Sequence, residues 1–486
     1  MNGSLPRARR PLRSPDFRRL FAIRLVSQSC DGLFQAALVS SVVFSPDQDG
    51  TVMRFAVATL LVSLPFSVLG PFTGVFIDRW SRRRILVVAP LVRVAAVWLV
   101  LLGATSAPVP FYAGALWVLS VNRFYLATVV AVVPRVVPTE DLLIANSLSV
   151  VGGTVALLFG VFVGGQLADV VDAEAPVVIL AGLGWFTASA IATRIDSPLQ
   201  PHTLPGSPVG ADVGRVFREF ADGASRLVHA PRAVGPIVSI TLDQVGQGLV
   251  LVLSLYVFRD LFDQGVASFA NLIGAGGVGV LVGIATVGAL ERRFGKARLV
   301  AGAFVLGGVT LLAVGAYLTQ LSVLVASFGV GLTFAWKKIP VDTLVQEALP
   351  DGYRGRVFAV YDVAYNLARV VAAFLAVPLL PRLGPEGTVV AVGVVFLLWS
   401  PVLPRWLAQA PQVLVRFYAG GRADEEPRAI VWGGVEEDVE VQRRWLDERD
   451  GERRMRYRLA LADGTVVEIS KADADRGWRL ERELDG

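Results

Sequence analysis

Residues that bind metals or form disulfides are almost absent from this chain of 486 residues. Its single cysteine, Cys30, excludes a disulfide framework and a cysteine-based metal site. Its two histidines, His202 and His229, fall in one loop region, so a histidine metal centre is not expected either. We therefore expect no metal and no cofactor.

Charged residues are also scarce, at 18% of the chain, whereas 54% of the residues are hydrophobic and the mean hydropathy is +0.57. The apolar residues form blocks of about 20, a length that crosses a hydrocarbon core about 30 Å thick. The sequence therefore predicts an all-α membrane protein with twelve transmembrane helices. The predicted spans are 18–44, 53–77, 85–104, 111–133, 142–167, 176–193, 234–258, 266–290, 299–318, 321–345, 357–380 and 388–404.

Lysine and arginine in the short loops predict the orientation, because cytoplasmic loops carry an excess of both. If the N-terminus is cytoplasmic, the opposite loops hold only Arg259 and Arg382, with Arg54 at a boundary. We therefore predict a multi-pass protein of the plasma (inner) membrane with both termini in the cytoplasm. The cytoplasmic loops then hold Arg79, Arg82, Arg83, Arg84, Arg135, Arg292, Arg293, Lys296, Arg298, Arg354 and Arg356.

The second half of the chain repeats the first at a shift of 212 residues, which places Asp31 on Asp243 and Gln35 on Gln247. Two six-helix lobes related as parallel repeats are a known transporter architecture. Between them, apolar residues recur at helical spacing over 213–228, which predicts an amphipathic helix at the membrane surface. The expected segments are a basic N-terminus (1–17), a first lobe (18–193), a linker (194–233), a second lobe (234–404) and an extension (405–486).

The C-terminal extension differs in charge from the rest of the chain. The net charge is +9 up to Arg405 and −4 beyond it, so the basic surplus belongs to the membrane region and nucleic-acid binding is not expected. Alternating residues around Asp463 and Gly464 predict a β-hairpin. We expect a small cytoplasmic α/β or β domain whose core contains Trp432, Trp445 and Trp478, with a disordered charged tail as the alternative.

One loop motif resembles a known family. The stretch GVFIDRWSRRR from Gly74 is similar to the loop between helices 2 and 3 of the major facilitator superfamily, although Ser81 replaces the usual second glycine. A second copy begins at Gly288 and has Arg292 in place of the aspartate. The matching residues of the first copy are Gly74, Asp78, Arg79, Arg82 and Arg83.

A narrower resemblance covers nearly all of residues 10–405. Stretches beginning at Ser14, Val132 and Val345 are similar to the branch with the enterobactin exporter, macrolide efflux pumps and a lysophospholipid transporter. The helix 5 signature of drug antiporters is incomplete, because Val161 replaces its proline. The resemblance implies that helices 1, 4, 7 and 10 line a central cavity.

Polar residues on these four helices are the candidate substrate or proton site. Along the first span, polar residues recur at steps of four, three and four, which places them on one helical face. Asp31 and Asp243 serve either proton coupling or recognition of a cationic substrate; the alternative is a structural ion pair of Asp31 with Arg24 or Arg123. Lys337 is close enough to the cytoplasmic end to snorkel instead. The cavity set is Arg24, Gln28, Asp31, Gln35, Arg123, Asp243, Gln247 and Lys337.

Two further groups are assigned to the contact between the lobes. Asp362, Asn366 and Arg369 share a face of the eleventh span, and the resemblance implies that they hold the lobe interface rather than touch the substrate. At the cytoplasmic gate, the resemblance implies that Asp78 lies at the N-terminus of helix 11. Because Arg292 replaces its mirror aspartate, we expect a charge-swapped latch. The gate set is Gly74, Asp78, Arg79, Arg82, Arg83, Arg292, Arg293, Glu140, Asp141, Arg354 and Arg356.

The expected function is secondary active transport by a monomer, most simply proton-coupled efflux of a small amphipathic molecule, drug or siderophore. The chain contains no nucleotide-binding loop of the Gly-rich Lys-Ser or Lys-Thr type, and no catalytic constellation indicates an enzyme. The alternatives are a lysophospholipid or lipid transporter, and a membrane anchor or sensor that works through its C-terminal extension.

Overall fold

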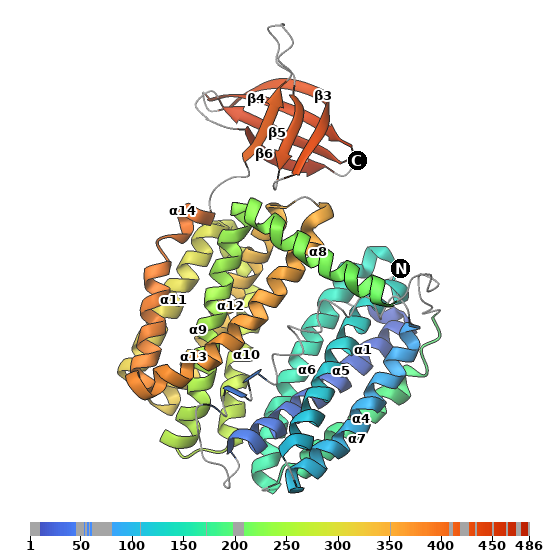
Figure 1. Cartoon of the computed structure of the whole chain (residues 1–486), viewed down its shortest axis with the longest axis vertical. Helices are drawn as coiled ribbons and strands as arrows, with labels where there is room; N and C mark the ends of the chain where they lie inside the picture. The colour runs from blue at the N-terminus through green and yellow to red at the C-terminus, as the bar shows by residue number, and fades with distance from the viewer. Residues whose placement is uncertain are drawn as a thin grey trace, which may run out of the picture.

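The computed structural model is a helical bundle with a small β-barrel at one end (Figure 1). The second predicted span, 53–77, lies almost wholly outside the described residues. The described residues are 10–44, 53, 56–57, 59–60, 80–106, 108–171, 173–197, 209–349, 351–407, 412–417, 427–432, 435–449, 452–462, 465–472 and 478–484.

The first lobe begins with a capped helix. The Ser14 hydroxyl accepts a hydrogen bond from the backbone N–H of Phe17 at 3.2 Å, and Pro15 occupies the first turn, where its missing N–H costs nothing. The helices of this lobe are α1 (Pro15–Val39), α4 (Arg82–Ser106), α5 (Pro108–Val136), α6 (Leu142–Val171) and α7 (Ala175–Ala192), with short turns η2 (Pro11–Arg13) and η5 (Thr139–Asp141).

Asp16 links the start of α1 to the segment that follows α7. Its carboxylate accepts hydrogen bonds from the Ser197 backbone N–H at 2.8 Å and the Ser197 hydroxyl at 2.5 Å, and it pairs with Arg19 at 2.8 Å. Burial alone would raise the pKa of Asp16, but these hydrogen bonds hold the pKa below its usual value. The contact therefore contributes stability at neutral pH that is lost as the pH falls through this lowered pKa.

The second lobe ends in two helices joined by a sharp kink. Gly384 has a φ of 69°, which glycine adopts without a steric penalty, and Pro385 follows it. The kink divides α13 into the two predicted spans 357–380 and 388–404. The helices of this lobe are α9 (Pro231–Tyr256), α10 (Val266–Phe294), α11 (Lys296–Ala316), α12 (Gln320–Glu347) and α13 (Asp351–Trp399), followed by the short α14 (Leu403–Leu407).

Nine helices in the described part of the chain are long and apolar enough to cross a membrane. The kinked α13 counts once among them, and α1, which is polar along much of its length, does not count. The mostly helical membrane architecture is thus confirmed, and every predicted span except the second coincides with a helical segment.

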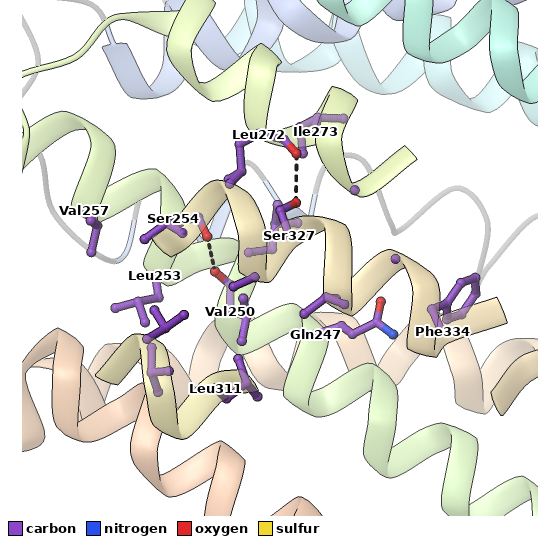
Figure 2. A pocket seen from close by; sticks show the side chains of 18 of the residues that line it. Gln247, Val250, Leu253, Ser254, Val257, Leu272, Ile273, Leu311, Ser327 and Phe334 are labelled. Atoms are coloured by element: carbon purple, nitrogen blue, oxygen red, sulfur yellow. Dashed lines mark hydrogen bonds between the residues drawn. The ribbon is translucent and has the colours of Figure 1, made fainter. Parts of the chain in front are cut away.

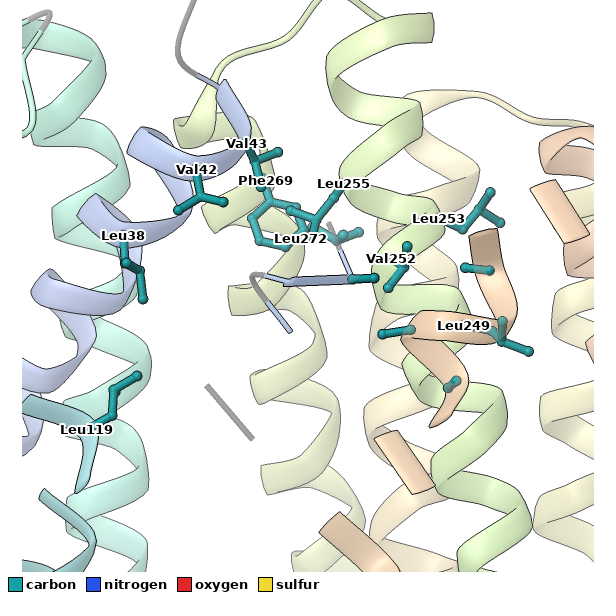
Figure 3. Packing of buried hydrophobic residues seen from close by; sticks show 14 of the residues in the cluster. Leu38, Val42, Val43, Leu119, Leu249, Val252, Leu253, Leu255, Phe269 and Leu272 are labelled. Atoms are coloured by element: carbon teal, nitrogen blue, oxygen red, sulfur yellow. The ribbon is translucent and has the colours of Figure 1, made fainter. Parts of the chain in front are cut away.

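The described contacts between the lobes lie in the half of the bundle opposite the barrel, and between α6 and α10 they reach mid-helix at Leu158 and Gly277. Phe44, in the π-helical turn η3 (Ser40–Phe44) after α1, packs on Phe269 of α10 with ring centroids 6.1 Å apart. The Gln166 side-chain amide donates to the Asn271 side chain at 3.3 Å. Figure 3 shows Val43, Phe269 and Leu255 together at this end, and Figure 1 shows the lobes diverging toward the other.

The linker helix α8 (Val209–His229) is fastened to the second lobe. Asp222 pairs with Arg356 of α13 at 2.7 Å. The Arg226 guanidinium lies 4.6 Å from the ring centroid of Tyr353. A helix with one strongly polar face is thereby held across the diverging end of the bundle (Figure 1).

The C-terminal extension is a closed six-stranded antiparallel barrel in sequential order. The predicted hairpin is present, because β4 pairs with β5 and Tyr457 lies opposite Ile469. Trp478 joins the core through an edge contact with Tyr457, with ring centroids 5.2 Å apart, whereas Trp445 packs against Arg443 outside the core. The strands are β1 (Gln412–Phe417), β2 (Pro427–Trp432), β3 (Val435–Arg449), β4 (Glu452–Leu461), β5 (Val466–Ala472) and β6 (Trp478–Leu484).

Candidate functional site

A buried ion pair lies inside the first lobe. Asp31 of α1 pairs with Arg93 of α4 at 2.5 Å, and the two side chains are 2% and 0% exposed. Trp185 of α7 donates its indole N–H to the same carboxylate oxygen at 3.1 Å. Four helices meet here, because Arg93 also donates to Asn122 of α5 at 3.2 Å and to Ser27 at 2.7 Å.

The expected partners of Asp31 were wrong. Arg24 donates instead to the Ser149 hydroxyl of α6 at 2.9 Å. Helical spacing places Arg24 and Asp31 on one broad face, but a face about 100° wide contacts more than one neighbouring helix. Arg24 lies against α6, and Asp31 lies against α4 and α7.

The second lobe contains its own buried ion pair, between Asp243 of α9 and Lys337 of α12. The two side chains are 0% and 2% exposed. Gln247 donates its side-chain amide to the other oxygen of Asp243 at 2.6 Å. The Lys337 ammonium also lies about 5 Å from two ring centroids, those of Phe304 at 4.9 Å and Phe396 at 5.0 Å.

One expectation about this pair is therefore corrected. The basic partner of Asp243 comes from another helix, α12. Lys337 was expected to be able to snorkel toward the membrane surface. Its side chain is instead enclosed among α9, α11 and α13, because two aromatic rings and a carboxylate stabilise the ammonium there.

The cation of the pair comes from a different helix in each lobe. At the repeat shift of 212, Lys337 falls on Tyr125, and the Tyr125 ring lies 5.1 Å from the Arg93 guanidinium. The first lobe thus has an aromatic residue where the second has a cation. Arginine keeps its proton inside proteins, whereas a buried lysine can release it. The two pairs are therefore not chemically equivalent.

A cavity of about 240 Å³ lies inside the second lobe, next to this ion pair. Its walls come from α9, α10, α11, α12 and α13 and are mainly aliphatic (Figure 2). Its polar groups include Gln247, Ser254, Ser327 and Arg369. Figure 2 shows Ser254 and Ser327 turned to backbone carbonyls, at 2.7 and 2.8 Å, so their hydroxyls are already used.

A second cavity, of about 140 Å³, lies between the lobes. Gln35 and Val161 line it from the first lobe, and Phe269 lines it from the second. Three residues, Leu251, Ile273 and Arg369, line both cavities. Arg369 was expected at the lobe interface and away from substrate, and the structure places it at the junction of the two cavities.

The remaining predicted cavity and interface residues are scattered. Gln28 is buried on α1, and its side-chain oxygen has no hydrogen-bond partner among the described residues. Asp362 is exposed and lies within electrostatic range of Lys338 and Arg123. The Asn366 side chain donates to the Asp362 carbonyl of its own helix at 2.7 Å.

The gate residues are separated in this arrangement of the lobes. Gly74, Asp78 and Arg79 lie outside the described residues. Arg82 is buried at the start of α4, and Arg83 donates to the Thr193 carbonyl at 2.6 Å. Arg354 caps the end of α12 through the Gln346 carbonyl at 3.0 Å, and Arg356 pairs with Asp222 of α8.

The proposed latch is open in this arrangement. In the described part of the chain, neither Arg292 nor Arg293 pairs with Glu140 or Asp141; Arg293 lies over the Phe294 ring at 5.3 Å. Because the lobes touch at the opposite end, the latch stays a prediction for the alternate state.

Sequence reasoning did not pair Arg93 with Asp31, and it placed Arg369 at the lobe interface without the cavities that Arg369 lines. An arginine in the middle of an apolar span is itself a signal, because burying its charge requires a partner. Arg93 and Arg369 both carry that signal. What the spacing could not supply was the identity of the neighbouring helix.

Known transporters are similar in sequence to this chain. The sequence profile of the Major Facilitator Superfamily matches residues 21–373 and 238–432. An uncharacterized MFS-type transporter of Mycobacterium tuberculosis is 28% identical over 389 residues, which cover 78% of this chain and 88% of that protein. Macrolide efflux protein A of Streptococcus pyogenes is 29% identical over 135 residues, which cover 26% of this chain and 31% of that protein.

A solved structure shares the fold at low sequence identity. A POT family transporter in complex with 5-aminolevulinic acid superposes with a TM-score of 0.63 at 12% identity. The match covers 80% of this chain and 96% of that one. At this identity the likeness extends to the fold alone.

Proposed function

Because the chain belongs to the Major Facilitator Superfamily, we propose that it is a proton-coupled secondary transporter that exports a small amphipathic molecule by alternating access between its two lobes. In this proposal the barrel and α8 face the cytoplasm. The described lobe contacts lie at the opposite end, so the central region would be open to the cytoplasm and ready to load a substrate for export.

The observation that carries the proposal is the Asp243–Lys337 pair with its link to the cavity. Gln247 lines the 240 Å³ cavity and donates to Asp243 at 2.6 Å. Gln247 can donate its amide either to Asp243 or to a substrate, so a substrate in the cavity changes the hydrogen bonding of the carboxylate and with it the proton affinity. Proton binding neutralises Asp243 and releases Lys337 from its partner. Substrate and proton occupancy are thereby coupled through one side chain.

The first-lobe pair is assigned a structural role. Arg93 contacts Asp31, Asn122, Ser27 and the Trp185 ring, whose centroid is 4.5 Å away, and an arginine side chain keeps its charge inside proteins. A proton that neutralised Asp31 would leave this buried guanidinium without its counter-ion. In this proposal the first lobe is therefore a fixed support, and the change of protonation takes place at Asp243 in the second lobe.

The test is proton-driven uptake into inverted vesicles, measured with a pH-sensitive dye across a panel of amphipathic compounds that includes a macrolide and a siderophore. We expect Asp243→Asn to abolish proton movement. Asp31→Asn should retain proton movement in the fraction of molecules that fold. The exposed Arg382→Gln is the matched control, because it removes a charge far from the pair. Wild-type proton-coupled uptake by Asp243→Asn would contradict the assignment.

The second candidate function is transport of a lysophospholipid or another lipid, which the aliphatic lining of both cavities favours. It predicts lipid-like density in the cavities and a lateral opening between helices. A third, a membrane anchor or sensor, would depend on the barrel. Full transport by a chain that lacks residues 411–486 would exclude that role.

A further inference from the structure

Arg369, in the second half of its span, has no carboxylate partner among the described residues. There its guanidinium makes one hydrogen bond, to the Gln244 side-chain oxygen at 2.9 Å. A guanidinium carries five N–H donors, so the described part of the chain uses only a minority of them. The nearest acid on the same helix face, Asp362, lies seven residues earlier, about 10 Å along the axis.

Snorkelling does not account for Arg369. The first half of α13 runs to the kink at Gly384, fifteen residues later and roughly 22 Å along the axis. An extended arginine side chain does not cover that distance. The Arg369 side chain is instead half-buried at the junction of the two cavities. It lines both of them together with Leu251 and Ile273.

The surroundings of Arg369 define what could bind it. On one side lies the 240 Å³ cavity lined by Val250, Leu272 and other aliphatic residues. On the other lies the 140 Å³ cavity lined by Val161 and Phe269. No carboxylate lines either cavity in the described part of the chain, so neither offers a counter-charge to a cationic ligand.

The geometry points to an anion-binding site at Arg369 for an amphipathic anion, with the charged head on the guanidinium and the apolar part in the adjoining cavities. Arginine suits this role because its planar fork binds a phosphate or carboxylate through two parallel hydrogen bonds. Gln244, which is fully buried, acts as a positioning residue through its bond to Arg369. The inference rests on the proposed transport function and names the substrate class of that site.

The experiment measures binding at equilibrium, without a pH gradient. The protein is placed in phosphatidylcholine nanodiscs, and dodecyl phosphate, dodecyltrimethylammonium and an uncharged dodecyl glycoside are titrated by calorimetry. We expect saturable binding of dodecyl phosphate alone. Arg369→Gln should weaken it by roughly tenfold or more, and Arg369→Lys, which keeps the charge without the fork, by less. Arg382→Gln on the same helix is the control and should bind as the wild type does.

A chain-length series tests the apolar half of the site. Ala326 lines only the larger cavity, so Ala326→Phe should weaken binding of dodecyl phosphate more than that of butyl phosphate. Phosphatidylglycerol added to the nanodiscs distinguishes the source of the anion. Competition with dodecyl phosphate assigns a bilayer lipid, and absence of competition assigns a water-soluble amphiphile.

Two results would overturn the site. One is wild-type affinity for dodecyl phosphate in both folded Arg369 variants, and the other is equal binding of dodecyltrimethylammonium. Neither depends on proton-driven transport. If Asp243→Asn instead kept wild-type proton-coupled uptake while binding of dodecyl phosphate still depended on Arg369, the proposed function would be overturned and the anion site would stand.

Discussion

At the scale of single residues, the protein holds two buried carboxylates in two different ways. Arg93 donates to Asp31, Asn122 and Ser27 and lies over two aromatic rings. Lys337 has one carboxylate partner and two rings. In the function proposed above, the first pair is the support and the second takes part in coupling. The proposal separates the two by the chemistry of the cation, because arginine keeps its proton inside proteins and a buried lysine can release it.

This difference predicts the stability of the first-lobe pair. Asp31→Asn leaves the Arg93 charge buried without a counter-ion, which should lower the free energy of unfolding by about 3–5 kcal/mol. Replacing both members, as Asp31→Asn with Arg93→Leu, should recover part of the loss. Denaturant titration in detergent micelles measures both values. Additive losses in the double variant would show that the two side chains do not interact.

At the scale of elements, small residues set how closely the helices pack. A Cβ at Gly160 of α6 would lie 1.9 Å from the Ser29 carbonyl oxygen of α1, and a Cβ at Gly32 would lie 2.2 Å from the Leu157 carbonyl oxygen. In the second lobe, a Cβ at Gly331 of α12 would likewise lie 1.9 Å from the Gly276 carbonyl oxygen of α10. Close backbone contact is what drives helix association where lipid removes the hydrophobic advantage.

We therefore expect Gly160→Ala to separate α1 from α6 and destabilise the first lobe by about 3 kcal/mol, near the upper end for overpacking. The matched control is Gly302→Ala on α11, where nothing lies within 4 Å of the added methyl group. That variant should be neutral or gain up to about 1 kcal/mol from helix propensity. Thermal unfolding midpoints of the purified proteins compare the two. Equal midpoints would argue against backbone contact at Gly160.

At the scale of the whole molecule, the lobes meet at the end opposite the barrel, and the latch residues are apart. When the lobes rock to the alternate state, we expect Arg292 or Arg293 to pair with Glu140 or Asp141. Exposed ion pairs are weak, so Arg292→Glu should slow transport only a few-fold. Glu140→Arg in the same chain should restore part of the rate.

The control for the latch is Arg298→Glu combined with Glu140→Arg, because Arg298 is an exposed arginine at the start of the neighbouring α11. This combination should show no rescue in the same vesicle assay. Rescue by both combinations would indicate a general charge effect on topology, and rescue by neither would remove the latch.

The sequence by itself determined the spans other than the second, which lies almost wholly outside the described residues, and also the two-lobe repeat and the hairpin of the extension. These follow from local rules: a bilayer requires about 20 apolar residues per crossing, and alternation of residues defines a strand. It also identified Asp243, Gln247 and Lys337 as polar residues inside apolar spans, where a charge is costly enough to need a reason.

Only the tertiary structure decided which charges meet. A helical period places a residue on a face, but the identity of the helix against that face depends on how all the spans pack. Arg93 was therefore missed as the partner of Asp31, and Arg369 was assigned to an interface although it lines two cavities. The closed barrel was likewise beyond the sequence, because the pairing of β1 with β6 joins strands more than 60 residues apart. Long-range pairing of this kind has no local signal, and it decides both the site and its chemistry.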